Sequence, residues 1–208
     1  MAKPSAKKSL YSVHPGVAMV QATIARLKEK TGRSLDEWLK LVNKSGPPTE
    51  KERREWLKEH YNLGTNYSWW IAEQSVGKGT EDTDPDEYLK AADRYVEEMY
   101  SGGKAGLRPI YDRLLALGLG IGRDVKACPC KTIVPLYRNH VFAQIKPSTR
   151  TRVDFGFALG KIRGKGRLVE TGGFAKKDRI THCIAIASLD EIDGEVKRWL
   201  KTAYDLDR

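Results

Sequence analysis

The chain has 208 residues, of which 40% are hydrophobic and 31% are charged, and its formal net charge is +10. This length holds one large domain or two small ones, and the composition suits a soluble protein with a core. The apolar runs, such as Cys183 to Ala187, are far too short to span a bilayer, which excludes a membrane-spanning chain.

The first twelve residues are basic and polar and contain no apolar stretch. We therefore predict a disordered tail over residues 1–12 and not a secretory signal. The chain has three cysteines, and an odd number does not favour a disulfide framework. We expect a cytoplasmic protein without a membrane partner.

Residues 13–75 carry the start and stop signals of four short helices. Ser34 with Glu37, and Thr49 with Glu52, have the spacing of capping boxes. Glycine and proline follow the helical stretches. The sequence therefore predicts a small all-α domain over residues 13–75.

Residues 76–84 are acidic, contain glycine and have few apolar side chains, so we predict a linker there. Asp84 and Pro85 are typical of a helix start. Residues 85–208 are predicted to form the second domain, in which two helices precede an antiparallel sheet and one helix closes it. The predicted fold class is α+β.

The segment from Lys131 to Leu159 is predicted to be a meander of three antiparallel strands with one buried face. Its β-branched and aromatic residues occur with a period of two, and turn-forming residues separate the three runs. A further strand is predicted over residues 178–188. There His182 shares one face with Ile180, Ile184 and Ile186, and we interpret it as a partly buried, hydrogen-bonded histidine.

The last helix is predicted to begin at Ser188, because Ser188 and Glu191 have the spacing of a capping box. Its apolar residues form one stripe, which is expected to pack on the sheet.

Two parts of the sequence resemble known families. DEWLKLVNKSGPPTEKERREWLKEHYNLGTNYSWWIAEQS resembles an N-terminal bacterial domain of unknown function, over about residues 13–75, although Asn62-Leu63-Gly64 stands where Gly-Leu-Gly is usual. DRITHCIAIASLDEIDGEVKRWLKTAYD, with the meander before it, resembles a second domain of unknown function, and this resemblance covers about residues 86–205. More loosely, KTIVPLYRNHVFAQIKP is similar to the small α/β domains of the YdhG and YjbR type. The wider group has been linked to iron-chaperone and DNA-binding roles, but the resemblance assigns no catalytic residue.

Cys128 and Cys130 form the pair of residues most suited to a metal, which His140, His182 or Cys183 could complete. Zinc-binding pairs usually have a longer spacing, and a second pair is missing from the sequence. We interpret both as small buried residues at a strand start and expect no metal.

The sequence contains no phosphate-binding loop, dinucleotide fingerprint, nucleophile elbow or zinc-protease motif, so we expect no cofactor and assign no catalytic residue. Asp154 lies on a predicted strand and is a candidate base. We interpret it as facing solvent or pairing with Arg152.

The helices on either side of Gly64 are spaced like a helix-turn-helix, which would have small residues near His60 and Trp70. Because those positions are large, we interpret the nearby tryptophans as core residues: Trp56, Trp69 and Trp70.

Positive charge is concentrated between Arg123 and Arg179, where 14 basic residues face four acidic ones. Glycine-spaced cations can follow phosphates without reading bases. We predict a face that binds nucleic acid or another polyanion through Lys161, Arg163, Lys165, Arg167, Lys176, Lys177 and Arg179. The expected function is therefore that of a non-enzymatic binding protein. The alternative is a small-molecule-binding or enzymatic α+β domain with a pocket between sheet and helices.

Overall fold

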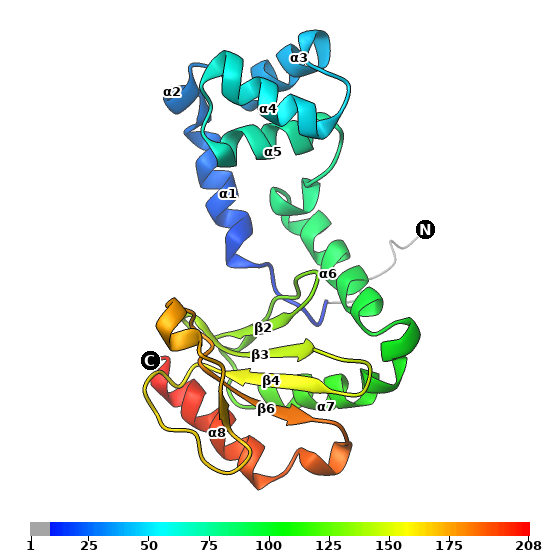
Figure 1. Ribbon diagram of the computed structural model, residues 1–208, viewed down its shortest axis with the longest axis vertical. Helices are drawn as coiled ribbons and strands as arrows, with labels where there is room; N and C mark the ends of the chain where they lie inside the picture. Colours follow the sequence, from blue (N-terminus) through cyan, green and yellow to red (C-terminus); the bar gives the residue numbers. More distant parts are fainter. Residues whose placement is uncertain (1–8) are drawn as a thin grey trace, which may run out of the picture. The chain divides into compact units, whose positions relative to one another are not determined.

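The structure is a computed structural model that describes residues 9–208, so residues 1–8 of the predicted tail lie outside the described residues. The chain divides into two compact units. One holds residues 13–89, and the other joins residues 90–208 to the described residues 9–12. The predicted α+β class is confirmed, with a helical first region and a sheet in the second (Figure 1). Within the described residues, no helix is both long and apolar enough to cross a bilayer.

The first unit is helical, and its elements are α1 (Pro15–Ala25), α2 (Leu27–Thr31), α3 (Leu35–Ser45), α4 (Glu50–Tyr61), α5 (Thr65–Ser75) and η1 (Thr80–Asp82). Both predicted capping boxes are present, one at the start of α3 and one at the start of α4. The predicted first helix is broken at Arg26, whose N–H bonds to the Thr23 carbonyl three residues back. The helix start predicted at Asp84 and Pro85 is confirmed. Asp84 Oδ1 accepts hydrogen bonds from two N–H groups in the first turn of α6 (Pro85–Met99).

Tryptophans supply part of the core of the first unit, as predicted, but not all of them do. Trp38 and Trp70 are buried, and Trp56 packs against the same cluster from its edge. Trp69 is 41% exposed, so its interpretation as a core residue is wrong. The buried Trp70 and Ile71 lie beside it on α5, and a helix cannot turn all its faces to one core.

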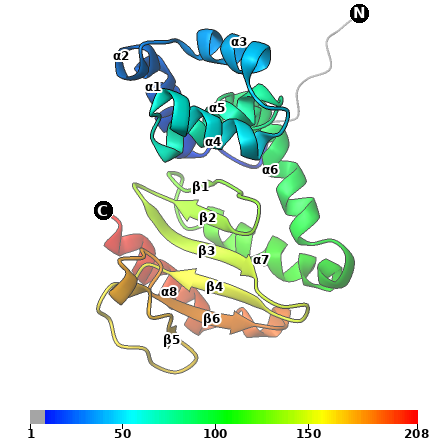
Figure 2. The same ribbon diagram turned by 45° about the horizontal axis from the view of Figure 1, so that its top comes forward.

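The second unit is built on a sheet. After α6 its elements are η2 (Gly102–Leu107), α7 (Arg108–Leu119), β1 (Lys126–Ala127), β2 (Val134–Tyr137), β3 (Val141–Pro147), β4 (Val153–Phe157), β5 (Val169–Glu170), η3 (Gly173–Lys176), β6 (His182–Ile186), η4 (Leu189–Glu191) and α8 (Gly194–Leu206). The strand order is β1-β2-β3-β4-β6-β5 and every neighbouring pair is antiparallel. The predicted three-stranded meander is β2–β3–β4. The predicted fourth strand is β6, which lies between β4 and the edge strand β5 (Figure 2).

The two faces of this sheet differ in chemistry because side chains alternate along each strand. One row of register partners runs Val134, Ile145, Phe155 and Ile184 across β2, β3, β4 and β6, and all four side chains are fully buried. Both α7 and α8 lie against this apolar face (Figure 1). The neighbouring row, on the other face, runs Pro135, Gln144, Gly156 and Cys183.

Helix α7 lies close to the sheet at Gly118. A Cβ atom at this position would collide with the side chain of Leu136 on β2, so glycine is required for the close contact. Residues 9–12, which the sequence assigned to the tail, contact the same helix: the hydroxyl of the buried Tyr11 lies 2.9 Å from that of Tyr111. The Ser12 N–H also donates to the Ala127 carbonyl in β1.

His182 lies on the apolar face and is almost fully buried, as its pattern indicates. Its Nδ1 is 2.8 Å from the Thr181 hydroxyl, whereas Nε2 is buried without a partner in the described part of the chain. The prediction that Ile180 shares this face is wrong. Strand β6 begins only at His182, and Ile180 instead packs over Gly156 on the polar face, where Ile180 Cγ2 lies 2.7 Å from the position of a Cβ.

The predicted start of the closing helix is also wrong. Ser188 begins the short helix η4, and α8 is capped by Asp193, whose carboxylate accepts hydrogen bonds from the Glu195 and Val196 N–H groups. The Glu191 carboxylate accepts a hydrogen bond from the Ala187 N–H, and the Glu191 N–H donates to the Ser188 carbonyl, so the side-chain contacts of a capping box are not formed. Two acceptable capping residues lie five positions apart, and the chain uses the one that lets Val196 and Leu200 reach the sheet.

The two faces of β6 give a direct test of this fold. Replacing Ile184 by Ala removes a fully buried side chain, so the free energy of unfolding should fall by about 2–5 kcal/mol. Replacing the neighbouring exposed Ala185 by Ser, on the opposite face, should change it by less than about 0.5 kcal/mol. Urea denaturation followed by circular dichroism measures both values, and equal midpoints for the two variants would contradict this packing.

Candidate polyanion-binding face

The predicted cations lie on two segments that flank the edge strand β5 (Figure 2). The first, residues 160–167, connects β4 to β5, and the second, residues 171–180, connects β5 to β6 and contains η3. Gly160, Gly166 and Gly172 have positive φ angles, which allow the tight turns in these segments. The structure therefore brings the two predicted groups of cations to one edge of the sheet.

Four of the seven predicted residues are well placed to meet an anion. Arg163, Lys165, Lys176 and Lys177 are exposed, and within residues 9–208 none of them forms an ion pair. Lys161 is exposed as well. The positive charges of the first four residues are therefore not neutralised by neighbouring carboxylates.

Arg167 has a different role, because its guanidinium holds the loop to the start of α8. Nε lies 3.1 Å from a Glu195 carboxylate oxygen, Nη2 lies 2.6 Å from Asp193, and Nη1 donates to the Glu191 carbonyl. The Val196 N–H, and next the charge of Arg167, hold the pKa of Asp193 below its ordinary value. Arg167 is thus engaged by two carboxylates and is not available to an external phosphate.

Arg179 is also engaged. It pairs with the carboxylate of Asp207, which is only 3% exposed, and donates to the Val141 carbonyl. The same carboxylate accepts hydrogen bonds from the Asn139 and His140 N–H groups, at 3.0 and 2.8 Å. Arg179 therefore joins the end of the chain to the β2–β3 turn.

A polar cleft lies on the face of the sheet opposite the helices and is partly covered by residues 171–180. Its volume is about 210 Å³, and Lys146 and Lys176 line it together with Gln144 and Thr171. The cleft also has two acidic residues, Asp154 and Asp178, and its floor includes Gly156 and Cys183. Sequence reasoning missed Lys146, although its alternation with the buried Ala143 and Ile145 on β3 could have identified it.

The acidic groups of the cleft are already engaged. Asp154 pairs with Arg152, whose Nε lies 2.9 Å from one carboxylate oxygen, and accepts a hydrogen bond from the Ser148 hydroxyl on the other. The predicted pairing of Asp154 with Arg152 is therefore present. Asp178 accepts a hydrogen bond from the Ile180 N–H. These contacts leave the cleft lysines as the groups available to an incoming anion.

Two of the three thiols, those of Cys128 and Cys183, are not activated. Burial, and next the charge of Asp154, raise the pKa of Cys183, so its thiol stays protonated at neutral pH. Burial raises the pKa of Cys128 to about 12, and Cys130 Sγ lies 3.8 Å from the Cys128 carbonyl. In the part of the chain that the structure describes, no three His, Cys, Asp or Glu side chains are grouped to hold a metal ion.

Most aromatic residues of the meander lie in the core, as their alternation predicts. Phe142, Phe155 and Phe157 are fully buried, and burial raises the pKa of the half-buried Tyr137 to about 12. None of the three phenylalanine rings is therefore exposed to stack on a base. The face offers cations for phosphates, and these do not distinguish sequences.

Comparison with known proteins supports the division of the chain seen in the sequence. A family model described as a domain of unknown function (DUF5655) matches residues 96–207, which is more than half of the chain. A second model, also described as a domain of unknown function (DUF4287), matches residues 19–74. The predicted pair of domains of unknown function is thus confirmed, whereas the likeness to the YdhG and YjbR type and the bacterial origin stay predictions. No curated protein and no solved structure matches the chain.

The distinction between structural and available cations can be measured by their effect on stability. Arg179→Ala should lower the free energy of unfolding by about 1–3 kcal/mol, because the buried Asp207 carboxylate loses a charged partner. Lys177→Ala, two residues away, removes an exposed cation without an ion pair in residues 9–208 and should change it by less than about 0.5 kcal/mol. Equal urea midpoints for both variants would show that Arg179 is not a structural residue.

Proposed function

We propose that this chain, which belongs to the family of the domain of unknown function DUF5655, binds nucleic acid or another polyanion through the face around β5. The observation that carries the proposal is the set of exposed cations without ion pairs in the described chain: Arg163, Lys165, Lys176 and Lys177. We name these four residues the β5 cations. Lys146 adds a fifth positive charge from the neighbouring cleft.

Binding would rest on contacts with phosphates. Each phosphate that a cation neutralises releases condensed counterions, so affinity falls steeply as salt rises. The glycines of the first segment let the chain adjust to the spacing of successive phosphates. Since the three phenylalanine rings of the meander are buried, binding should depend little on base sequence.

The polar cleft would hold one phosphate of the chain. Lys146 and Lys176 supply two ammonium groups from β3 and η3, and Gln144 and Thr171 supply neutral hydrogen-bond donors. The two acidic residues of the cleft have partners of their own. Asp154 pairs with Arg152 and accepts a hydrogen bond from Ser148, and Asp178 accepts one from a backbone N–H. Their repulsion toward an anion is therefore partly offset.

The test is a binding titration with labelled duplex and single-stranded DNA at several salt concentrations. Replacing all four β5 cations by Ala should weaken binding to every sequence at about 50 mM salt. It should also reduce the slope of log K against log salt by as much as about 3.6, because each of four phosphates on duplex contributes about 0.9. Folding should be unchanged, since all four side chains are exposed.

A matched control removes the same total charge from elsewhere in the second unit. Arg123, Lys126, Lys131 and Arg198 are all exposed, and replacing them by Ala should leave most of the salt slope in place. Equal losses in the two quadruple variants would mean that only net charge matters. No binding by the natural chain at micromolar concentration and about 50 mM salt, where the electrostatic attraction is strong, would refute the proposal.

A further inference from the structure

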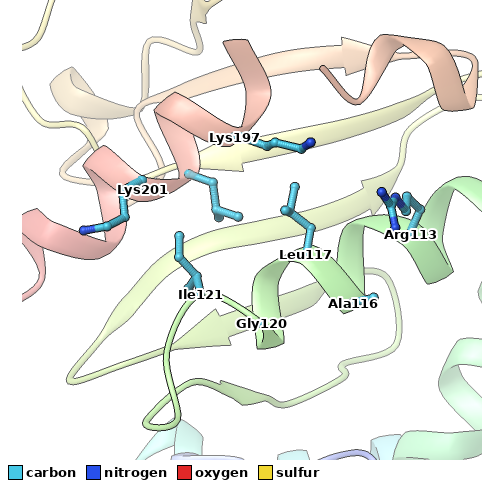
Figure 3. A pocket seen from close by; sticks show the side chains of 8 residues that line it. Arg113, Ala116, Leu117, Gly120, Ile121, Lys197 and Lys201 are labelled. Atoms are coloured by element: carbon cyan, nitrogen blue, oxygen red, sulfur yellow. The ribbon is translucent and has the colours of Figure 1, made fainter. Parts of the chain in front are cut away.

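A second concave surface lies on the other side of the second unit, between α7 and α8 (Figure 3). It is an open groove of about 470 Å³, within the size range of small-molecule sites. Because α7 and α8 cover the apolar face of the sheet, this groove is separate from the polar cleft and from the β5 cations.

The floor of the groove is apolar. Leu117 and Ile121 are half-buried and point from α7 and its C-terminal end toward α8 (Figure 3). Ala116 on α7 is exposed and also lines the groove, and the buried Leu200 lies beneath it on α8. Gly120 has no side chain to fill the space beside Ile121. A contiguous set of incompletely buried aliphatic groups favours contact with the hydrocarbon part of a ligand.

The rim of the groove is positively charged. Arg113 comes from α7, and Lys197 and Lys201 come from α8. Lys197 extends along the groove toward Arg113 (Figure 3). Lys201 pairs with Asp205, whereas Arg113 and Lys197 form no ion pair among residues 9–208, and no described carboxylate lines the groove.

We propose that this groove binds a small organic anion with an apolar body, such as an alkyl or aryl carboxylate or sulfonate. The hydrocarbon part would lie on Ala116, Leu117 and Ile121, and the anionic group would meet Arg113 and Lys197. An uncharged apolar molecule would leave the two cations without a partner, and a polyphosphate would leave the apolar floor uncovered. The combination of an aliphatic floor and a cationic rim therefore selects for amphipathic anions.

The fluorescent aryl sulfonate 8-anilinonaphthalene-1-sulfonate is a suitable probe, since its emission rises on contact with apolar surface. The folded natural chain should bind one probe molecule, and decanoate should displace it more effectively than decanol. Arg113→Glu combined with Lys197→Glu should weaken probe binding by at least about tenfold, the effect of losing one strong charge-assisted hydrogen bond. Both side chains are exposed, so the denaturation midpoint should not change.

The matched control is Lys126→Glu combined with Arg198→Glu, which makes the same change in net charge at two exposed positions outside the groove. This variant should keep the affinity of the natural chain for the probe. The Ala variant of the β5 cations should also keep it, so a failure of polyanion binding and a failure at the groove can be told apart. Absence of probe binding, binding of many probe molecules per chain, or equal weakening in the two Glu variants would overturn the proposal.

Discussion

The packing of α7 and α8 on one face of the sheet is the contact on which the second unit depends. The register places Val134, Ile145, Phe155 and Ile184 in one row, and their burial requires a cover of helices. Gly118 lets α7 come close enough to β2 to cover this apolar row. As a consequence, the apolar and aromatic side chains of the meander are used for folding, and the opposite face is left to Gln144, Lys146, Asp154 and Cys183. Recognition in the polar cleft on that face has to rely mainly on charge and hydrogen bonds.

The features that the sequence predicted well are those set by neighbouring residues. The capping boxes at Ser34 and Thr49 depend on groups three residues apart, and the meander depends on alternation within single strands. The errors arose where the local sequence allows two structures and tertiary packing selects one of them. Ser188 and Asp193 both suit a helix start, and tertiary packing of α8 decides for Asp193. Ile180 continues the alternation of β6 in the sequence, but the strand begins only at His182 and Ile180 turns to the other face.

The candidate site was only partly predictable for a related reason. A count of cations along the chain does not reveal their partners, and these lie far away in sequence. Arg167 meets carboxylates 26 and 28 residues later, and Arg179 meets Asp207 28 residues later. Lys146 could have been identified from the alternation of β3, because that signal is local. The groove between α7 and α8 could not, since Arg113 and Lys197 come together only when both helices pack on the sheet.

The two proposed anion-binding surfaces of the second unit differ in the force that would hold a ligand, and this difference is measurable. At the β5 cations the charges are exposed on glycine-containing segments, so the interaction is nearly all electrostatic and is screened within about 8 Å at physiological salt. At the groove, burial of hydrocarbon on Ala116, Leu117 and Ile121 contributes a part that salt does not screen. Raising salt should therefore release a polyanion long before it releases an amphipathic anion. This order follows from where the apolar side chains lie, because the groove sets the half-buried Leu117 and Ile121 beside Arg113 and Lys197.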